Sequence, residues 1–330
     1  MKAKIAVMGS GSWATALLKI LTHNHHEVSW WVRQQSTIDY VHKFHHNPNY
    51  LSSVEIKLAA DKIGTHAKDL IKGVDYILMA TPSAYFKSAV EGLNKDDLKG
   101  KHIISAIKGL IQPENISVSQ YMHEKFDIPL DHFTNISGPC HAEEVAAEKL
   151  SYLTFASLDE DTARFISGFF KCRFLYTSAS HDLHGTEYAS VLKNVYALAA
   201  GVSVGLGYGD NFRAVFISSS MLEMEHFINS VCRGKRNLME AAYLGDTMVT
   251  AYSQYSRNRT FGVMIGKGYS INAATLELNM IAEGYYATNS LHAIAQAKGV
   301  RMPILNTMFE ILYEAKPAEQ AFKVLAAEIV

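Results

Sequence analysis

A single lysine stands in an otherwise apolar stretch. Residues 191–200 read Val-Leu-Lys-Asn-Val-Tyr-Ala-Leu-Ala-Ala, and Lys193 is the one charge among them. A helix that is apolar on all sides is buried, and burial lowers the pKa of a lysine towards the range in which it both gives and takes up a proton. Lys193 is therefore a candidate general acid and base, and Asp246, the one charge in residues 243–248, is available as its partner. The alternative is a lysine whose stem packs while its ammonium reaches water.

Two further groups of residues suit an anionic ligand. Residues 256–260, Ser-Arg-Asn-Arg-Thr, concentrate guanidinium and amide donors that fit a phosphate dianion, although a solvated arginine pair is the alternative. Lys108 follows a predicted strand, at the carboxyl edge of the expected sheet, where ligands of open α/β sheets bind.

A glycine turn follows the first apolar run. Gly9, Gly11 and Ala14 form a G-x-G-x-x-A sequence between a predicted strand and a predicted helix, the context of a dinucleotide-binding turn. Gly9 would make the tight turn, Gly11 would let the backbone approach a pyrophosphate, and Ala14 would allow close packing of the helix on the strand. Glycines that serve only the turn are the alternative. Arg33 follows the second strand without a nearby carboxylate, which favours acceptance of NADP; a solvated arginine is again the alternative.

Two kinds of pattern position these residues. Short β-rich runs at 5–8, 28–32, 76–80, 103–107 and 134–136 alternate with helical stretches, as in a doubly wound sheet. After residue 185 the apolar spacing becomes helical and stays so to the end. We therefore expect an α/β fold with an N-terminal Rossmann-type, mostly parallel sheet over residues 1–185 and an all-helical domain that carries substrate and catalytic groups over residues 186–330.

Composition excludes several classes of function. The 330 residues are 48% hydrophobic and 19% charged, with a net charge of -1, so neither disorder nor binding to nucleic acid is expected. Three scattered cysteines favour a reducing compartment without disulfides or zinc, and the histidine clusters lack the spacing of a metal site. No stretch is long and apolar enough to span a bilayer, so we expect a cytoplasmic protein without membrane insertion.

The chain resembles the bacterial type of NAD(P)-dependent glycerol-3-phosphate dehydrogenase nearly end to end. The resemblance rests on eight motifs, at residues 9–13, 108–109, 137–139, 192–195, 205–211, 244–246, 256–259 and 283–284. It implies reversible hydride transfer between C2 of glycerol 3-phosphate and NAD or NADP, dihydroxyacetone phosphate as the other substrate, and a supply of glycerol 3-phosphate for phospholipid synthesis. A homodimer is expected by analogy alone.

The resemblance also implies roles for single residues. Lys193 matches the proton acceptor, Asp246 would orient it, and Lys108 would touch both substrate and cofactor. The implied substrate-contact positions are Lys108, Gly138, Cys140, Lys193, Asp246, Ser256, Arg257 and Asn258. The implied cofactor-contact positions, with the glycine turn, are Gly9, Gly11, Ser12, Trp13, Arg33, Tyr50, Lys108, Ala142, Arg257, Ile281 and Glu283.

Some residues depart from the family pattern near these positions. They are Ala14, Cys140, His141, Tyr243, Thr247, Tyr285 and Tyr286. Two rival functions stay open: a β-hydroxy acid dehydrogenase of the same two-domain plan, and a nucleotide-sensing protein without catalysis.

Overall fold

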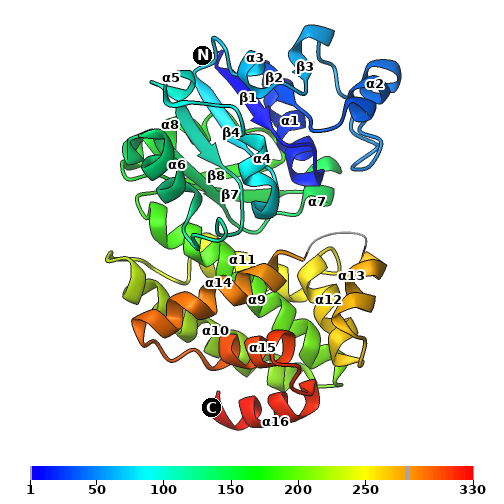
Figure 1. Cartoon of the computed structure of the whole chain (residues 1–330), viewed down its shortest axis with the longest axis vertical. Coiled ribbons are helices and arrows are strands. Elements are labelled where there is room, and N and C mark those ends of the chain that lie inside the picture. The colour runs from blue at the N-terminus through cyan, green and yellow to red at the C-terminus, as the bar shows by residue number, and fades with distance from the viewer. Residues whose placement is uncertain (1, 279–281, 330) are drawn as a thin grey trace. The chain divides into compact units, whose positions relative to one another are not determined.

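The computed structural model describes residues 2–278 and 282–329 and separates into two compact units (Figure 1). The N-terminal unit contains the residues up to Ile107 together with Ile116–Leu183. The C-terminal unit contains Lys108–Asn115 and the described residues from His184 onward. The short segment Lys108–Asn115 thus packs with the helical residues, although residues of the other unit precede and follow it in sequence. Each unit has its own hydrophobic core.

One sheet of eight strands forms the centre of the N-terminal unit. The strands are β1 (Lys4–Met8), β2 (Glu27–Trp31), β3 (Ile63–Gly64), β4 (Tyr76–Met79), β5 (His102–Ser105), β6 (Phe133–Ser137), β7 (Ser151–Ala156) and β8 (Leu175–Ser180). Their order is β3-β2-β1-β4-β5-β6-β7-β8, and every neighbouring pair is parallel except β6 and β7. The chain reverses its direction of winding between β1 and β4, so the carboxyl ends of these two strands mark the expected ligand edge.

The N-terminal unit also contains helices, several of which contact strands of this sheet. They are α1 (Ser12–His23), α2 (Gln35–Phe44), α3 (Ala67–Leu70), α4 (Phe86–Ala89), α5 (Lys95–Leu98), α6 (Val118–Phe126), α7 (Ala142–Ala146) and α8 (Glu160–Ser167), with short turns η1 (Ala60–Lys62), η2 (Ser83–Tyr85) and η3 (Leu130–His132). Helix α1 packs on β1, β2 and α7. Its buried residues include Ala14, Leu17 and Leu21, at the spacing of one helical face.

The regular elements of the C-terminal unit are helices throughout the part that the structure describes. Its elements are α9 (Leu183–Gly205), α10 (Asp210–Val231), the π-helical turn η4 (Ala241–Gly245), α11 (Asp246–Tyr252), α12 (Arg257–Gly266), α13 (Ile271–Leu278), α14 (Glu283–Lys298), α15 (Pro303–Tyr313) and α16 (Ala318–Glu328). Every residue from 189 to 203 in α9 is buried, so this helix is apolar on all sides, as its sequence predicts.

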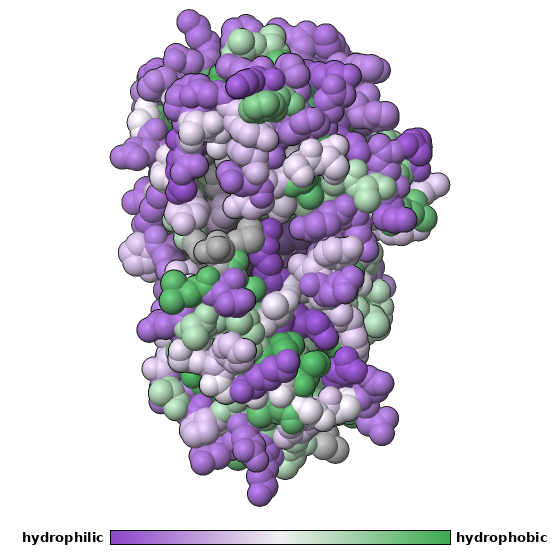
Figure 2. Space-filling view, turned by 90° about the vertical axis from the view of Figure 1, so that its right-hand side faces the viewer, coloured by the Kyte–Doolittle hydropathy of each residue, from purple (hydrophilic) through white to green (hydrophobic). Residues whose placement is uncertain are grey.

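The predicted fold class is confirmed, because a mostly parallel sheet precedes an all-helical region. All five predicted strands are present, and β3, β7 and β8 are additional. The face shown in Figure 2 is mainly hydrophilic, with hydrophobic residues in small separate groups. Among the described helices, none has the length and apolarity needed to cross a membrane.

Candidate functional site

The glycine turn between β1 and α1 has the geometry of an anion-binding turn. Gly9 has φ +132°, and a Cβ there would lie 2.6 Å from the Ala80 carbonyl oxygen, so only glycine fits. Gly11 caps the start of α1, and a Cβ there would meet nothing within 4 Å. Ala14 is fully buried. Open space therefore lies beside Gly11 at the start of α1, where the predicted cofactor-contact residues Ser12 and Trp13 stand, and the first-turn amides of a helix favour an anion.

Asn47 braces this turn, and the sequence reading missed it. Its side chain is fully buried, and Nδ2 donates to the Ser10 carbonyl at 3.0 Å and to Thr15 Oγ1 at 2.9 Å. Its Oδ1 accepts from the backbone N–H groups of Asn49 and Tyr50. The buried asparagine thus connects the glycine turn to the loop that carries Tyr50. In the sequence, Asn47 follows the cluster of His42, His45 and His46, and no pattern there indicates its contact with the glycine turn.

Arg33 follows β2 at the carboxyl edge of the sheet. Its guanidinium lies over the Tyr85 ring, 4.7 Å from the ring centroid, and the side chain is exposed. A guanidinium that lies over an aromatic ring retains N–H donors for a phosphate oxygen.

A second loop at this edge follows β6. Gly138 has φ +112°, and a Cβ there would lie 3.0 Å from the Tyr152 carbonyl oxygen. Cys140 is 9% exposed, and Ala142 begins the short helix α7, which packs against α1. The N-terminal unit therefore brings the loop of Gly138, Cys140 and Ala142 to the same sheet edge as the glycine turn.

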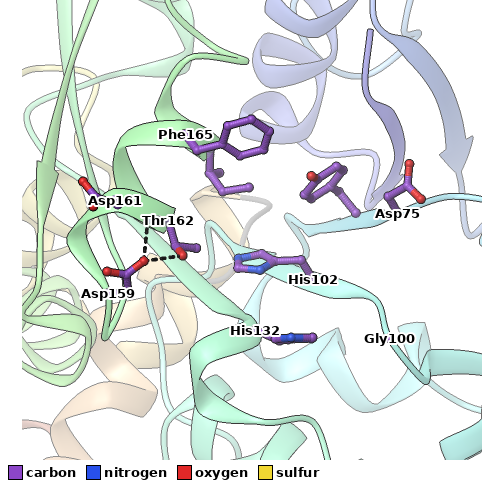
Figure 3. A pocket seen from close by; sticks show the side chains of 10 residues that line it. Asp75, Gly100, His102, His132, Asp159, Asp161, Thr162 and Phe165 are labelled. Atoms are coloured by element: carbon purple, nitrogen blue, oxygen red, sulfur yellow. Dashed lines mark hydrogen bonds between the residues drawn. The ribbon is translucent and has the colours of Figure 1, made fainter. Parts of the chain in front are cut away.

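A hollow of about 420 Å³ opens at the opposite edge of the same sheet (Figure 3). It is lined where β4 and β5 begin, by Tyr76 and His102, and at the start of α8. Two of its acidic groups have partners nearby: Asp159 accepts from the Thr162 N–H and hydroxyl, and Asp161 lies 3.8 Å from Arg164. Among the described residues, no three His, Cys, Asp or Glu side chains are arranged to hold a metal ion. This edge lacks the glycine turn, so the hollow does not fit a dinucleotide.

Three charged side chains meet in the C-terminal unit. Lys193 of α9 is 4% exposed, and its Nζ donates to Oδ1 of Asp246, the fully buried first residue of α11. Lys108 Nζ lies 3.7 Å from the other carboxylate oxygen, Oδ2. The ammonium of Lys193 therefore does not snorkel to water. Two cations share one carboxylate, which leaves a surplus of one positive charge when all three groups are ionised.

Burial and charge act on the pKa of Lys193 in opposite directions. Burial lowers the pKa of its ammonium most strongly; the carboxylate of Asp246 raises the pKa, and the nearby cation of Lys108 lowers it. The net direction is downward from the ordinary lysine value. A lysine in this state can both donate and accept a proton close to neutral pH.

A chain of amide hydrogen bonds holds this cluster. Asn194 Nδ2 donates to the Lys108 carbonyl at 2.9 Å, and Asn258 Nδ2 donates to Asn194 Oδ1 at 2.9 Å. The Gly284 N–H donates to Asn258 Oδ1 at 2.9 Å. The starts of α12 and α14 are thereby tied to α9 beside Lys193. Asn258 was predicted from the sequence as a ligand of the phosphate, and Asn194 was overlooked. The amide nitrogen of Asn258 carries two hydrogens, and the bond to Asn194 uses one of them, so the other can serve a ligand.

The predicted phosphate-binding residues stand at the start of α12. Ser256 is its N-cap, and Ser256 Oγ accepts from the Arg259 N–H at 3.3 Å. Arg257 and Asn258 are the first two helical residues. A helix N-terminus with a guanidinium beside it favours a phosphate. The roles proposed from sequence for these residues stay predictions.

Two further predicted cofactor-contact positions, Glu283 and Ile281, lie late in the chain. Glu283 begins α14 in the C-terminal unit, and Ile281 lies outside the described residues. Within the C-terminal unit the contacts connect Lys108, Lys193 and Asp246 directly, and Asn258 through Asn194.

Comparison with known proteins identifies the family. The model of the NAD-dependent glycerol-3-phosphate dehydrogenase N-terminus matches residues 4–163, and that of the C-terminus matches residues 182–323. The chain belongs to the NAD-dependent glycerol-3-phosphate dehydrogenase family. The glycerol-3-phosphate dehydrogenase [NAD(P)+] of Bacillus pumilus is 31% identical over 99% of this chain and 94% of its own length. That of Syntrophotalea carbinolica is 33% identical over 96% and 95%.

Solved structures also resemble this chain. The glycerol-3-phosphate dehydrogenase of Coxiella burnetii matches with a TM-score of 0.90 and 28% identity, over 98% of both chains. A ketopantoate reductase from Ralstonia eutropha matches with a TM-score of 0.58 and 13% identity over 99% of both chains, a likeness that concerns the fold alone.

Proposed function

We propose that this glycerol-3-phosphate dehydrogenase interconverts glycerol 3-phosphate and dihydroxyacetone phosphate with NAD(P), using Lys193 as the proton-transfer group. The single observation that carries the assignment of roles is the buried pairing of Lys193 with Asp246 beside Lys108. Family membership supports the reaction and its product, which serves phospholipid synthesis.

The N-terminal unit would hold the cofactor. The open space before Gly11, the amides at the start of α1 and the guanidinium of Arg33 fit a dinucleotide with or without a 2′-phosphate. When bound, the nicotinamide supplies the hydride in reduction and accepts it in oxidation.

The C-terminal unit would hold the phosphorylated substrate. Arg257 and the start of α12 bind the phosphate, and the surplus positive charge of Lys108, Lys193 and Asp246 attracts the oxygen on C2. During reduction Lys193 donates its proton to that oxygen, and Asp246 keeps the ammonium form populated. During oxidation the neutral amine of Lys193 takes the proton from the C2 hydroxyl.

Departures from the family pattern do not remove these groups. Tyr285, one of the bulky substitutions, stacks on Tyr313 at 4.9 Å, and the Tyr313 hydroxyl donates to the Tyr285 carbonyl at 2.7 Å. Its bulk therefore contributes to packing between α14 and α15. A homodimer and a cytoplasmic location also belong to the proposal.

The test measures oxidation of NADPH and NADH with dihydroxyacetone phosphate, beside dihydroxyacetone and a set of β-keto acids. Turnover that is far faster with dihydroxyacetone phosphate than with dihydroxyacetone, and that is lost in Lys193→Ala while the variant stays folded, supports the proposal. Turnover of a β-keto acid without a phosphate requirement would assign the chain to the rival dehydrogenases. Cofactor binding without reduction of any compound would favour the nucleotide sensor.

A further inference from the structure

Helices α9 and α12 contact each other first through a side-chain hydrogen bond and then, over the following turns, through their backbones. Asn194 pairs with Asn258 by an amide hydrogen bond. One turn further along both helices, a Cβ on Gly262 would lie 2.0 Å from the Leu198 carbonyl oxygen. After another turn, a Cβ on Gly266 would lie 2.4 Å from the carbonyl oxygen of Val202. The two helices therefore run parallel, with a constant register of 64 residues.

The same contact is lined with glycine from the α9 side. A Cβ on Gly201 would lie 2.1 Å from the Arg259 carbonyl oxygen, and one on Gly205 would lie 2.4 Å from that of Val263. Contacts under 3.0 Å essentially never occur for real Cβ atoms, so four glycines are needed for this approach. At this register, Arg257 and Lys193 occupy equivalent positions immediately before the paired asparagines.

We infer that the glycine contact between α9 and α12 sets the spacing of the phosphate anchor Arg257 from the proton-transfer group Lys193, which makes Gly262 a positioning residue for the phosphorylated substrate. This inference rests on the proposed function. A substrate held at both ends reacts only when its phosphate and its C2 oxygen reach their groups together. The spacing of the two helices therefore enters the rate for dihydroxyacetone phosphate. For a substrate that contacts only one of these two groups, the spacing of the helices should have little effect on the rate.

Gly262→Ala tests the inference. Its Cβ must move from 2.0 Å to at least 3.0 Å from the carbonyl oxygen, which separates the helices by about 1 Å. We expect kcat/KM for dihydroxyacetone phosphate to fall by about 100-fold, the size of loss that a misplacement of about 1 Å can cause. The inhibition constant of inorganic phosphate should stay close to its wild-type value, and the turnover of dihydroxyacetone should fall far less than that of dihydroxyacetone phosphate, because each probe uses one end of the site.

Ile265→Ala is the matched control. Ile265 is buried in the core on the same helix, and its truncation costs stability without forcing α9 and α12 apart. This control should lower the thermal midpoint while the ratio of kcat/KM between dihydroxyacetone phosphate and dihydroxyacetone stays unchanged. Gly266→Ala, one turn further from Arg257, should lower the ratio less than Gly262→Ala and replaces it if that variant does not fold.

Two results would overturn the inference. One is an unchanged ratio in a folded Gly262→Ala or Gly266→Ala enzyme. The other is a parallel loss for dihydroxyacetone phosphate, dihydroxyacetone and inorganic phosphate, which would mean general damage to the site. Failure of the proposed function is distinguishable, because the wild-type protein itself would then show no turnover that depends on phosphate.

Discussion

Replacing Asp246 by asparagine removes the one carboxylate that the buried ammonium of Lys193 shares with the partly buried ammonium of Lys108. Charges about 4 Å apart interact by about 4 kcal/mol at an effective dielectric constant of about 20. Each unit of pKa corresponds to about 1.4 kcal/mol, so loss of the carboxylate lowers the pKa of Lys193 by up to about 3 units. The amide keeps one oxygen acceptor for Nζ, and we therefore expect a fall of about 1–2 units.

The direction of the change is visible in the pH dependence of both reactions. Reduction requires the ammonium of Lys193, so its rate declines as pH rises through the lysine pKa. Oxidation requires the neutral amine, so its rate increases through the same pKa. In Asp246→Asn the pH–rate profiles of both reactions should move to lower pH. The rate of oxidation at acidic pH should therefore fall less than the rate of reduction at alkaline pH. The assay is kcat/KM against pH in both directions.

Stability supplies an independent measurement on the same variant. Breaking a buried ion pair by removing one partner costs about 3–5 kcal/mol while the other charge persists, so the loss of stability should be largest below the lowered pKa of Lys193. Lys193→Met should recover much of that loss when added to Asp246→Asn. A folded Asp246→Asn enzyme whose pH limbs coincide with those of the wild type would refute the assignment of Lys193 as the titrating group.

Three further outcomes follow from the N-terminal unit. Arg33→Ala should raise the KM for NADPH by about tenfold or more, the effect of a lost charge-assisted hydrogen bond, while the KM for NADH stays close to wild type; equal effects would show that Arg33 does not contact the 2′-phosphate. Asn47→Ala should lower the free energy of unfolding by about 2–3 kcal/mol and weaken both cofactors alike, because Ser10 and Tyr50 lose their buried partner; titration calorimetry and denaturant unfolding check this. Burial and the neighbouring His132 lower the pKa of His102 to about 4. The unfolded chain then binds a proton between pH 7 and 5 that the folded chain does not, so acidification should cost about 2 kcal/mol of stability, and His102→Gln should abolish this part of the pH dependence.

The sequence predicted the sheet where its strands are apolar on both faces. The runs that became β1, β4 and β5 are buried on both sides and are flanked by helical patterns. Strands β7 and β8 escaped prediction because they contain Ser, Thr and exposed Tyr residues, and β8 lies at the edge of the sheet. A strand of two residues such as β3 has no periodicity to read.

The pair of Lys193 and Asp246 was predictable for a physical reason. A charge in an apolar segment needs a partner, and the chain offers few isolated charges from which to choose. Asn194 and Asn258 lacked such a signal, because asparagine is common at helix ends and its partner lies 64 residues away. Their role follows from the contacts of α9 with α12 and α14.

Glycine positions show most clearly where sequence information ends. Gly201 and Gly205 share one face of α9, and Gly262 and Gly266 share one face of α12, so each pair is visible as a spacing of four residues. The spacing alone does not say which helices meet, and a lone pair is equally consistent with a weakened helix. Only the packed structure joins the two pairs at one register. The amino-acid types therefore predict the chemistry of the site, whereas its spacing depends on backbone contacts that side-chain chemistry does not specify.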